Sequence, residues 1–96
     1  MHFTEAADAD LEAIASYTIA RFGLEQARLY RDGLFKVFDL ISEFPQSGSE
    51  QVRLRPKLRR LVHDAHAIYY EIRDEDILVV RILGRGQDPL SSFEDD

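Results

Sequence analysis

The sequence predicts an α+β fold: an N-terminal antiparallel helical hairpin packed on a small, mostly antiparallel sheet of three or four strands. Apolar residues recur at three-and-four spacing over the first half of the chain and at alternate positions over the second half. Helices that precede the strands, rather than alternating with them, favour α+β over α/β. We therefore expect one domain over residues 1–96, with helices in 7–23 and 24–44, the sheet in 52–83 and a tail in 84–96.

The two predicted helices have ordinary start and stop signals. The first begins at Asp8 or Asp10, because carboxylates cap helix N-termini and complement the helix dipole. Gly23 ends it. Gly33 lies inside the second helix, where we expect it to let the helices approach closely. One apolar stripe of the first helix contains Leu11, Ile14, Ala15, Thr18 and Phe22. The expected apolar stripe of the second helix contains Ala27, Tyr30, Leu34, Val37 or Phe38, and Ile41.

The strand expected at residues 77–83 is apolar on both faces, which usually means that both faces are covered. Alternation assigns Leu78, Val80 and Ile82 to one face and Ile77, Val79, Arg81 and Leu83 to the other. Two helices cover only one face, so we expect a partner chain on the other, in contact with Ile77 and Val79. The alternative is that these two side chains are half-exposed. The stretch 1–4 is short for a strand, and we expect an open sheet edge beside it that favours strand addition.

Composition limits the function classes. With 96 residues and no cysteine, the chain has room for one modest core and offers neither disulfides nor thiolate ligands. No run is long enough to cross a bilayer and no secretion signal is visible, so we expect a cytoplasmic protein. A net charge of −6 argues against direct binding to free nucleic acid. The segment 53–60 is basic, which is typical either of a solvated loop or of a surface for one anionic partner.

The sequence shows no catalytic motif, and we expect no metal and no cofactor. His63 and His66 are three residues apart in strand-like sequence, so they are expected on opposite faces, which is poor geometry for a shared metal. Glu71 is expected to form a surface ion pair beside Arg73 rather than to act as a general base.

Arginines are the best candidates for contacts with a target. Their planar donors bind phosphate or carboxylate, so a cluster on the sheet could bind a nucleic-acid backbone or an acidic protein surface, or could pair inside the fold. Arg85, between two glycines after the last strand, and the tail to Phe93 are expected to form one target-contact element. The full set of target-binding candidates is Arg59, Arg60, Arg81, Arg85, Asp88 and Phe93.

Several motifs together resemble the toxins of the RelE/ParE superfamily. Ala7, Asp10, Ile14, Tyr17, Gly23, Ala27, Tyr30 and Leu34 are similar in type and spacing to that family's helical hairpin. The stretch FPQSG at residues 44–48 resembles its turn after the hairpin, and LRRLVHDAHAIYYEIRDEDILVVRIL resembles its sheet. The resemblance covers nearly the whole chain and implies a toxin of a type II toxin–antitoxin pair.

The resemblance favours the ParE-like branch, whose members bind DNA gyrase, over the RelE-like ribosome-dependent RNases. An RNase needs an acid–base pair besides cations, and Phe93 in the tail cannot transfer a proton. A non-toxic relative that only binds an antitoxin is a further alternative. The resemblance implies a ParD-like antitoxin that brings a helix or strand to apolar toxin surface. The antitoxin-binding candidates are Leu11, Ile14, Phe22, Ile77 and Val79.

Overall fold

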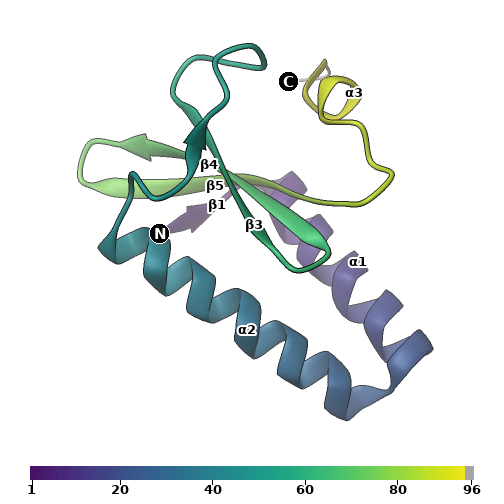
Figure 1. Cartoon of the computed structure of the whole chain (residues 1–96). Helices are drawn as coiled ribbons and strands as arrows, with labels where there is room; N and C mark the ends of the chain where they lie inside the picture. The colour runs from purple at the N-terminus through teal and green to yellow at the C-terminus, as the bar shows by residue number, and fades with distance from the viewer. Residues whose placement is uncertain (95–96) are drawn as a thin grey trace.

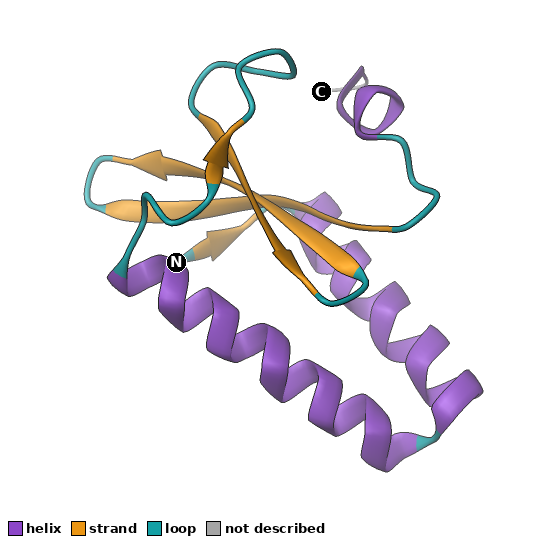
Figure 2. Ribbon diagram, viewed as in Figure 1, coloured by secondary structure: helices purple, strands orange, loops and turns teal. Residues whose placement is uncertain are grey.

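The computed structural model describes residues 1–94, and the tail acids Asp95 and Asp96 lie outside the described residues. A long helical hairpin lies on one side of a twisted sheet, and the β2–β3 loop and the C-terminal segment lie on the other (Figure 1). Figure 2 shows the same arrangement coloured by secondary structure, with the layer of strands between the helical hairpin and the loops. The predicted α+β class and helical hairpin are confirmed.

Helix α1 spans Glu5–Phe22, and its N-cap is Thr4 rather than Asp8 or Asp10. The Thr4 hydroxyl accepts a hydrogen bond from the backbone N–H of Ala7 (3.0 Å). Because this bond satisfies a free donor of the first turn, the helix starts two residues earlier than predicted. The predicted cap at Asp10 is wrong because this side chain lies well inside the helix and has another partner.

Helix α2 spans Leu24–Glu43 and follows α1 after Gly23 alone, which has a φ of 91°. The predicted apolar face of α2 is confirmed, since its buried residues are Ala27, Leu34, Phe38 and Ile41. Gly33 does not serve the helix–helix contact. A Cβ placed there would lie 3.0 Å from Nε2 of His63, so this glycine makes room for a histidine of the sheet.

The sheet has the strand order β1-β5-β4-β3-β2 within the described residues, and so contains one strand more than the largest number predicted. The difference comes from two strands of two residues each, β1 (His2–Phe3) and β2 (Ser49–Glu50). The long strands are β3 (Leu58–His63), β4 (His66–Arg73) and β5 (Asp76–Gly84). β1 pairs with β5 in parallel, and the other pairs are antiparallel.

A β-bulge in β5 changes which side chains face the helices. Tyr69 pairs with Arg81 but Tyr70 pairs with Val79, so Val80 is an extra residue in β5. Simple alternation fails at this point. Ile77, Val79 and Ile82 face the helical hairpin, whereas Leu78, Val80 and Leu83 lie on the opposite face. The predicted grouping of Ile82 with Leu78 and Val80 is therefore wrong.

The second face of the sheet is covered by the chain itself. Helix α3 (Pro89–Glu94) places Phe93 against Tyr69, with ring centroids 5.3 Å apart. The Arg55 guanidinium lies over the Phe93 ring, 5.2 Å from its centroid. The expectation that a 96-residue chain needs a partner to cover this face is therefore wrong, because the tail folds back over it.

The edge of β5 is also closed within the chain. Beyond the short β1, the Thr4 hydroxyl donates to the carbonyl of Val80 (2.7 Å). A carboxylate oxygen of Asp10 then accepts from the backbone N–H of Ile82 (2.8 Å). Side chains from the start of α1 thus replace a longer edge strand, and this edge is not open in the way the sequence suggested.

Candidate functional site

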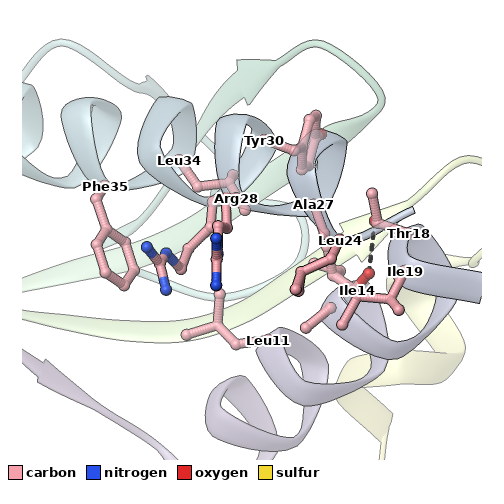
Figure 3. Close-up of a pocket in the computed structure, with 12 residues that line it drawn as sticks. Leu11, Ile14, Thr18, Ile19, Leu24, Ala27, Arg28, Tyr30, Leu34 and Phe35 are labelled. Carbon is pink, nitrogen blue, oxygen red and sulfur yellow. Dashed lines mark hydrogen bonds between the residues drawn. The ribbon is translucent and has the colours of Figure 1, made fainter. Parts of the chain in front are cut away.

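An apolar groove runs between α1 and α2 and encloses about 360 Å³. Figure 3 shows its walls, with Leu11 and Ile14 on α1 facing Leu24, Leu34 and Phe35 on α2. The remaining lining residues are Ala15, Thr18, Ile19, Ala27, Arg28, Tyr30 and Arg31.

The groove is apolar inside and basic at its rim. Leu24 and Phe35 keep 52% and 47% of their surface exposed, although both are large hydrophobic residues. The exposed Arg28 and Arg31 side chains come from the same helix. An exposed apolar groove of this kind is typical of a docking surface, and the arginines favour acidic residues beside the apolar contacts.

The predicted antitoxin-binding residues separate into two groups. Leu11 and Ile14 line the groove, and Phe22 lies exposed at the tip of the hairpin. Ile77 and Val79 are core residues, 5% and 0% exposed, that pack against the helices. They were selected because the strand is apolar on both faces, but those faces are covered by the helices and by the tail.

Arg81 is a structural residue rather than a free target contact. Its guanidinium forms a two-point ion pair with Asp10, at 2.8 and 2.9 Å, and donates to the carbonyl of Ser92 (3.2 Å). The pair is largely buried, with 19% and 10% of the Arg81 and Asp10 side chains exposed. It therefore connects α1, β5 and the tail at one point.

Arg59 and Arg60 are consecutive residues of β3 but make different contacts. Arg59 donates to the carbonyl of Gly48 (2.7 Å) and pairs with Glu50 (3.2 Å), so it holds the chain that leads from α2 into the sheet. Arg60 lies opposite Tyr69 in the sheet register. Together with Arg85, Arg60 lines a shallow depression of about 200 Å³ at the end of the sheet.

The segment after β5 is a turn followed by α3. Arg85 is exposed in this turn, where Gly86 has a φ of 87°. The backbone N–H of Gly84 donates to the side chain of Gln87 (2.7 Å), which fixes the turn. Asp88 accepts from the backbone N–H of Leu90 (3.0 Å) and thereby caps α3. Of this predicted target-contact segment, Arg85 is exposed and Phe93 is packed on the sheet.

Glu71 is not on the surface as predicted, since it is only 7% exposed. Its carboxylate pairs with Arg55 (3.1 Å) and with Arg73 (3.0 Å). Two cations close to a buried carboxylate compensate the cost of burying it. Glu71 thus fastens the β2–β3 loop to the sheet.

Tyr30, His63 and His66 form a cluster that the sequence reasoning missed. The Tyr30 hydroxyl is 2.5 Å from Nδ1 of His66, and its ring lies 5.6 Å from the His63 ring. His63 and His66 are direct cross-strand partners on either side of a turn at Asp64. Directly opposite residues share a face, so the expectation of opposite faces was wrong. The signal was available, because Asp64-Ala65 is turn-like sequence between two strand patterns.

The environment of this cluster shifts two pKa values. Burial raises the pKa of Tyr30 above its usual 10.0, and the nearby Asp64 carboxylate adds to this effect. Burial also lowers the pKa of His66 below its usual 6.5, with the Asp64 carboxylate opposing the shift and His63 adding to it. The neutral forms of both side chains are thus favoured in the folded protein.

Within residues 1–94, no group of three or more histidine, cysteine, aspartate or glutamate side chains is arranged to hold a metal ion. None of the helices in this part of the chain is long and apolar enough to cross a membrane.

Comparison with known proteins identifies the class. A solved structure titled "Chromosomal ParDE TA system from P. aeruginosa" superposes with a TM-score of 0.74 over 86% of this chain and 91% of that chain, at 20% identity. The family model described as "ParE toxin of type II toxin-antitoxin system, parDE" matches residues 1–89. The protein is therefore a toxin of the type II toxin–antitoxin class. Within that class, the chain belongs to the ParE toxin family.

Two curated relatives agree with this family. Toxin ParE1 of Caulobacter vibrioides is 32% identical over 77 residues, which cover 80% of this chain and 79% of the relative. Toxin ParE1 of Mycobacterium tuberculosis is 33% identical over 84 residues, which cover 86% of each. The predicted membership of the RelE/ParE superfamily and its ParE-like branch is confirmed.

Proposed function

We propose that this ParE-family toxin inhibits bacterial growth by binding DNA gyrase in the cytoplasm, and that a cognate ParD-like antitoxin neutralises it. Family membership over residues 1–89 carries the proposal. The surface chemistry supports it. Arg81 is paired with Asp10 within the fold, and Glu71 is held between Arg55 of the β2–β3 loop and Arg73 at the end of β4. Because these charged side chains already have partners within the fold, the sheet favours a binding function over ribonuclease chemistry.

The target contact is proposed at Arg85, with Arg60 beside it. Both line the depression at the end of the sheet, and Arg85 is exposed in a turn fixed by the Gln87 side chain. An exposed guanidinium on a turn with a fixed backbone is suited to an acidic protein surface. Phe93 and Asp88 stabilise the segment that follows Arg85. Phe93 packs on Tyr69 of the sheet, and Asp88 caps α3.

Controlled expression of the chain in a bacterium tests the proposal, with growth, chromosomal breaks and transcript integrity scored together. Growth arrest with DNA breaks and intact transcripts is expected. Arg85→Ala should remove the arrest without lowering the free energy of unfolding, whereas Arg53→Ala, in the exposed β2–β3 loop, should leave it intact. Arrest with cleaved transcripts would replace gyrase by RNA as the target, and normal growth would indicate a non-toxic relative.

The antitoxin is proposed to lay an amphipathic helix in the groove between α1 and α2. The apolar walls fit the apolar face of such a helix, and Arg28 and Arg31 fit acidic residues on its flanks. Leu24→Glu changes a groove residue that is already half-exposed, so folding should survive while antitoxin binding weakens. Leu29→Glu is the matched control, since Leu29 is 60% exposed on the same helix and does not line the groove.

A further inference from the structure

A second cavity, of about 430 Å³, lies between the tip of the helical hairpin and the β3–β4 turn. It shares Asp64, Ala65 and His66 with the depression that contains Arg85, but only this cavity is also lined by residues of α1 and α2. Three separate parts of the chain form its walls. The lining residues are Tyr17, Thr18, Phe22, Gln26, Tyr30, Asp64, Ala65 and His66.

Aromatic rings dominate these walls. Tyr17 and Phe22 are 60% and 59% exposed, which is unusual for rings that could pack on a core. Tyr30 is fixed by its hydrogen bond to Nδ1 of His66, and the centroids of these two rings are 5.4 Å apart. Two exposed rings and two fixed rings therefore surround one space.

Asp64 supplies a negative charge at the edge of this space. It lies in the β3–β4 turn with a φ of 54°, and it is exposed. Within residues 1–94, its carboxylate forms neither an ion pair nor a side-chain hydrogen bond, unlike Asp10 and Glu71. The Asp64 charge acts on both Tyr30 and His66, so it lies close to the aromatic walls.

We infer that this cavity binds an arginine side chain of a partner protein. Aromatic faces attract cations, a guanidinium stacks on them better than a compact ammonium does, and a free carboxylate can pair with its donors. The molecule already shows the first interaction, because the Arg21 guanidinium lies 5.8 Å from the centre of the Phe22 ring. The net charge of −6 also favours the approach of a cation.

The position of the cavity favours a side chain of a bound protein over a free small cation. Thr18 and Tyr30 line both this cavity and the groove between α1 and α2. A protein segment seated in the groove therefore passes the mouth of the cavity and can place an arginine in it. The inference rests on the proposed docking groove for the path of the partner, but it does not depend on gyrase as the target.

The test uses the purified full chain and short peptides, without antitoxin or gyrase, so its failure is separable from failure of the proposed function. The probe is an acetylated and amidated Gly-Gly-Arg-Gly-Gly peptide, and the matched ligand replaces arginine by citrulline, its neutral isostere. Binding is followed by NMR shifts of the His66 and Tyr30 rings. The arginine peptide is expected to bind with a Kd of about 1 mM and the citrulline peptide at least about tenfold more weakly.

Two matched variants test the role of Asp64, and the shift of Tyr30, which does not line the Arg85 depression, places the binding at this cavity. Asp64→Asn removes the charge and should weaken binding of the arginine peptide about tenfold. Asp74→Asn is the control, because Asp74 occupies the equivalent position in the β4–β5 turn with a φ of 52° and lies outside the cavity. Asparagine tolerates this backbone region, so both variants should keep their fold.

Three results would overturn the inference. One is equal binding of the arginine and citrulline peptides, and another is equal loss of binding in the Asp64→Asn and Asp74→Asn variants. The third is tighter binding of tetramethylammonium than of the arginine peptide, which would make the cavity a site for small organic cations and not for a side chain.

Discussion

Asp10 holds helix α1 to β5 through its ion pair with Arg81. Asp10→Asn removes the carboxylate that Asp10 places against the largely buried Arg81 guanidinium and should lower the free energy of unfolding by about 3 kcal/mol. Urea denaturation monitored by circular dichroism measures the difference. Asp8→Asn, an exposed carboxylate on the same helix, should change it by less than about 0.5 kcal/mol. Equal effects of the two variants would mean that the ion pair does not hold α1 to β5.

His66 should make stability depend on pH. Its pKa is lowered by burial, so the unfolded chain binds the proton more tightly than the folded protein does. The contribution of His66 to the free energy of unfolding is fully present above the ordinary histidine pKa, about 6.5. It is lost as the pH falls through the lower pKa of the folded protein. The difference in urea midpoint between the wild type and His66→Phe should therefore be smaller at acid pH than at neutral pH. Parallel pH profiles would exclude this role.

Sequence reasoning identified residue types better than residue partners. The arginines were proposed as target contacts, but Arg59 and Arg81 form hydrogen bonds and ion pairs within the fold, and an arginine and its carboxylate partner can be far apart in the sequence, as Asp10 and Arg81 are. Spacing along the chain does not contain that information. The pairing of His63 with His66 could have been predicted, because only a two-residue turn separates them.

The turn between α2 and β2 depends on a single glycine. Gly48 donates its backbone N–H to the Tyr70 hydroxyl (2.8 Å), which itself donates to the carbonyl of Pro45 (2.7 Å). A Cβ at this position would lie 2.7 Å from the same hydroxyl oxygen. Gly48→Ala should therefore displace Tyr70 and cost about 2 kcal/mol. Thermal unfolding measures this loss, and Ser47→Ala, exposed beside it, should leave the midpoint unchanged.

At the level of elements, helix spacing was the most reliable signal. The buried face of α2 agrees with the prediction because it follows from 3.6-residue periodicity alone. The strands were harder for two physical reasons. One extra residue at Val80 reverses the alternation of β5, and two-residue strands such as β1 have no periodicity to detect. Just beyond the bulge, the backbone N–H of Ile82 donates to Asp10, a contact between distant parts of the chain that no local pattern encodes.

At the level of the whole molecule, the helical hairpin carries most of the exposed large hydrophobic side chains. Its large exposed hydrophobic residues include Tyr17, Ile19, Phe22, Leu24, Leu29 and Phe35, whereas the two faces of the sheet are covered by the hairpin and the tail. Composition could not predict this distribution, because it counts apolar residues without locating them. Most of the exposed apolar side chains are thus on the hairpin, with Val62 of β3 as an exception on the sheet, and not on the strand 77–83 as its apolar sequence had suggested.

This surface should make the isolated chain self-associate. Burial of apolar area is the main driving force for association, and the groove leaves Leu24 and Phe35 in water. Light scattering coupled to size-exclusion chromatography is expected to show a mass that rises with protein concentration. A Leu24→Glu/Phe35→Glu double variant should elute with the mass of one chain at every concentration. Val52→Glu, which changes an exposed valine of the β2–β3 loop, should behave as the wild type. A wild-type chain that stays monomeric at high concentration would contradict the proposal that the groove is a docking surface.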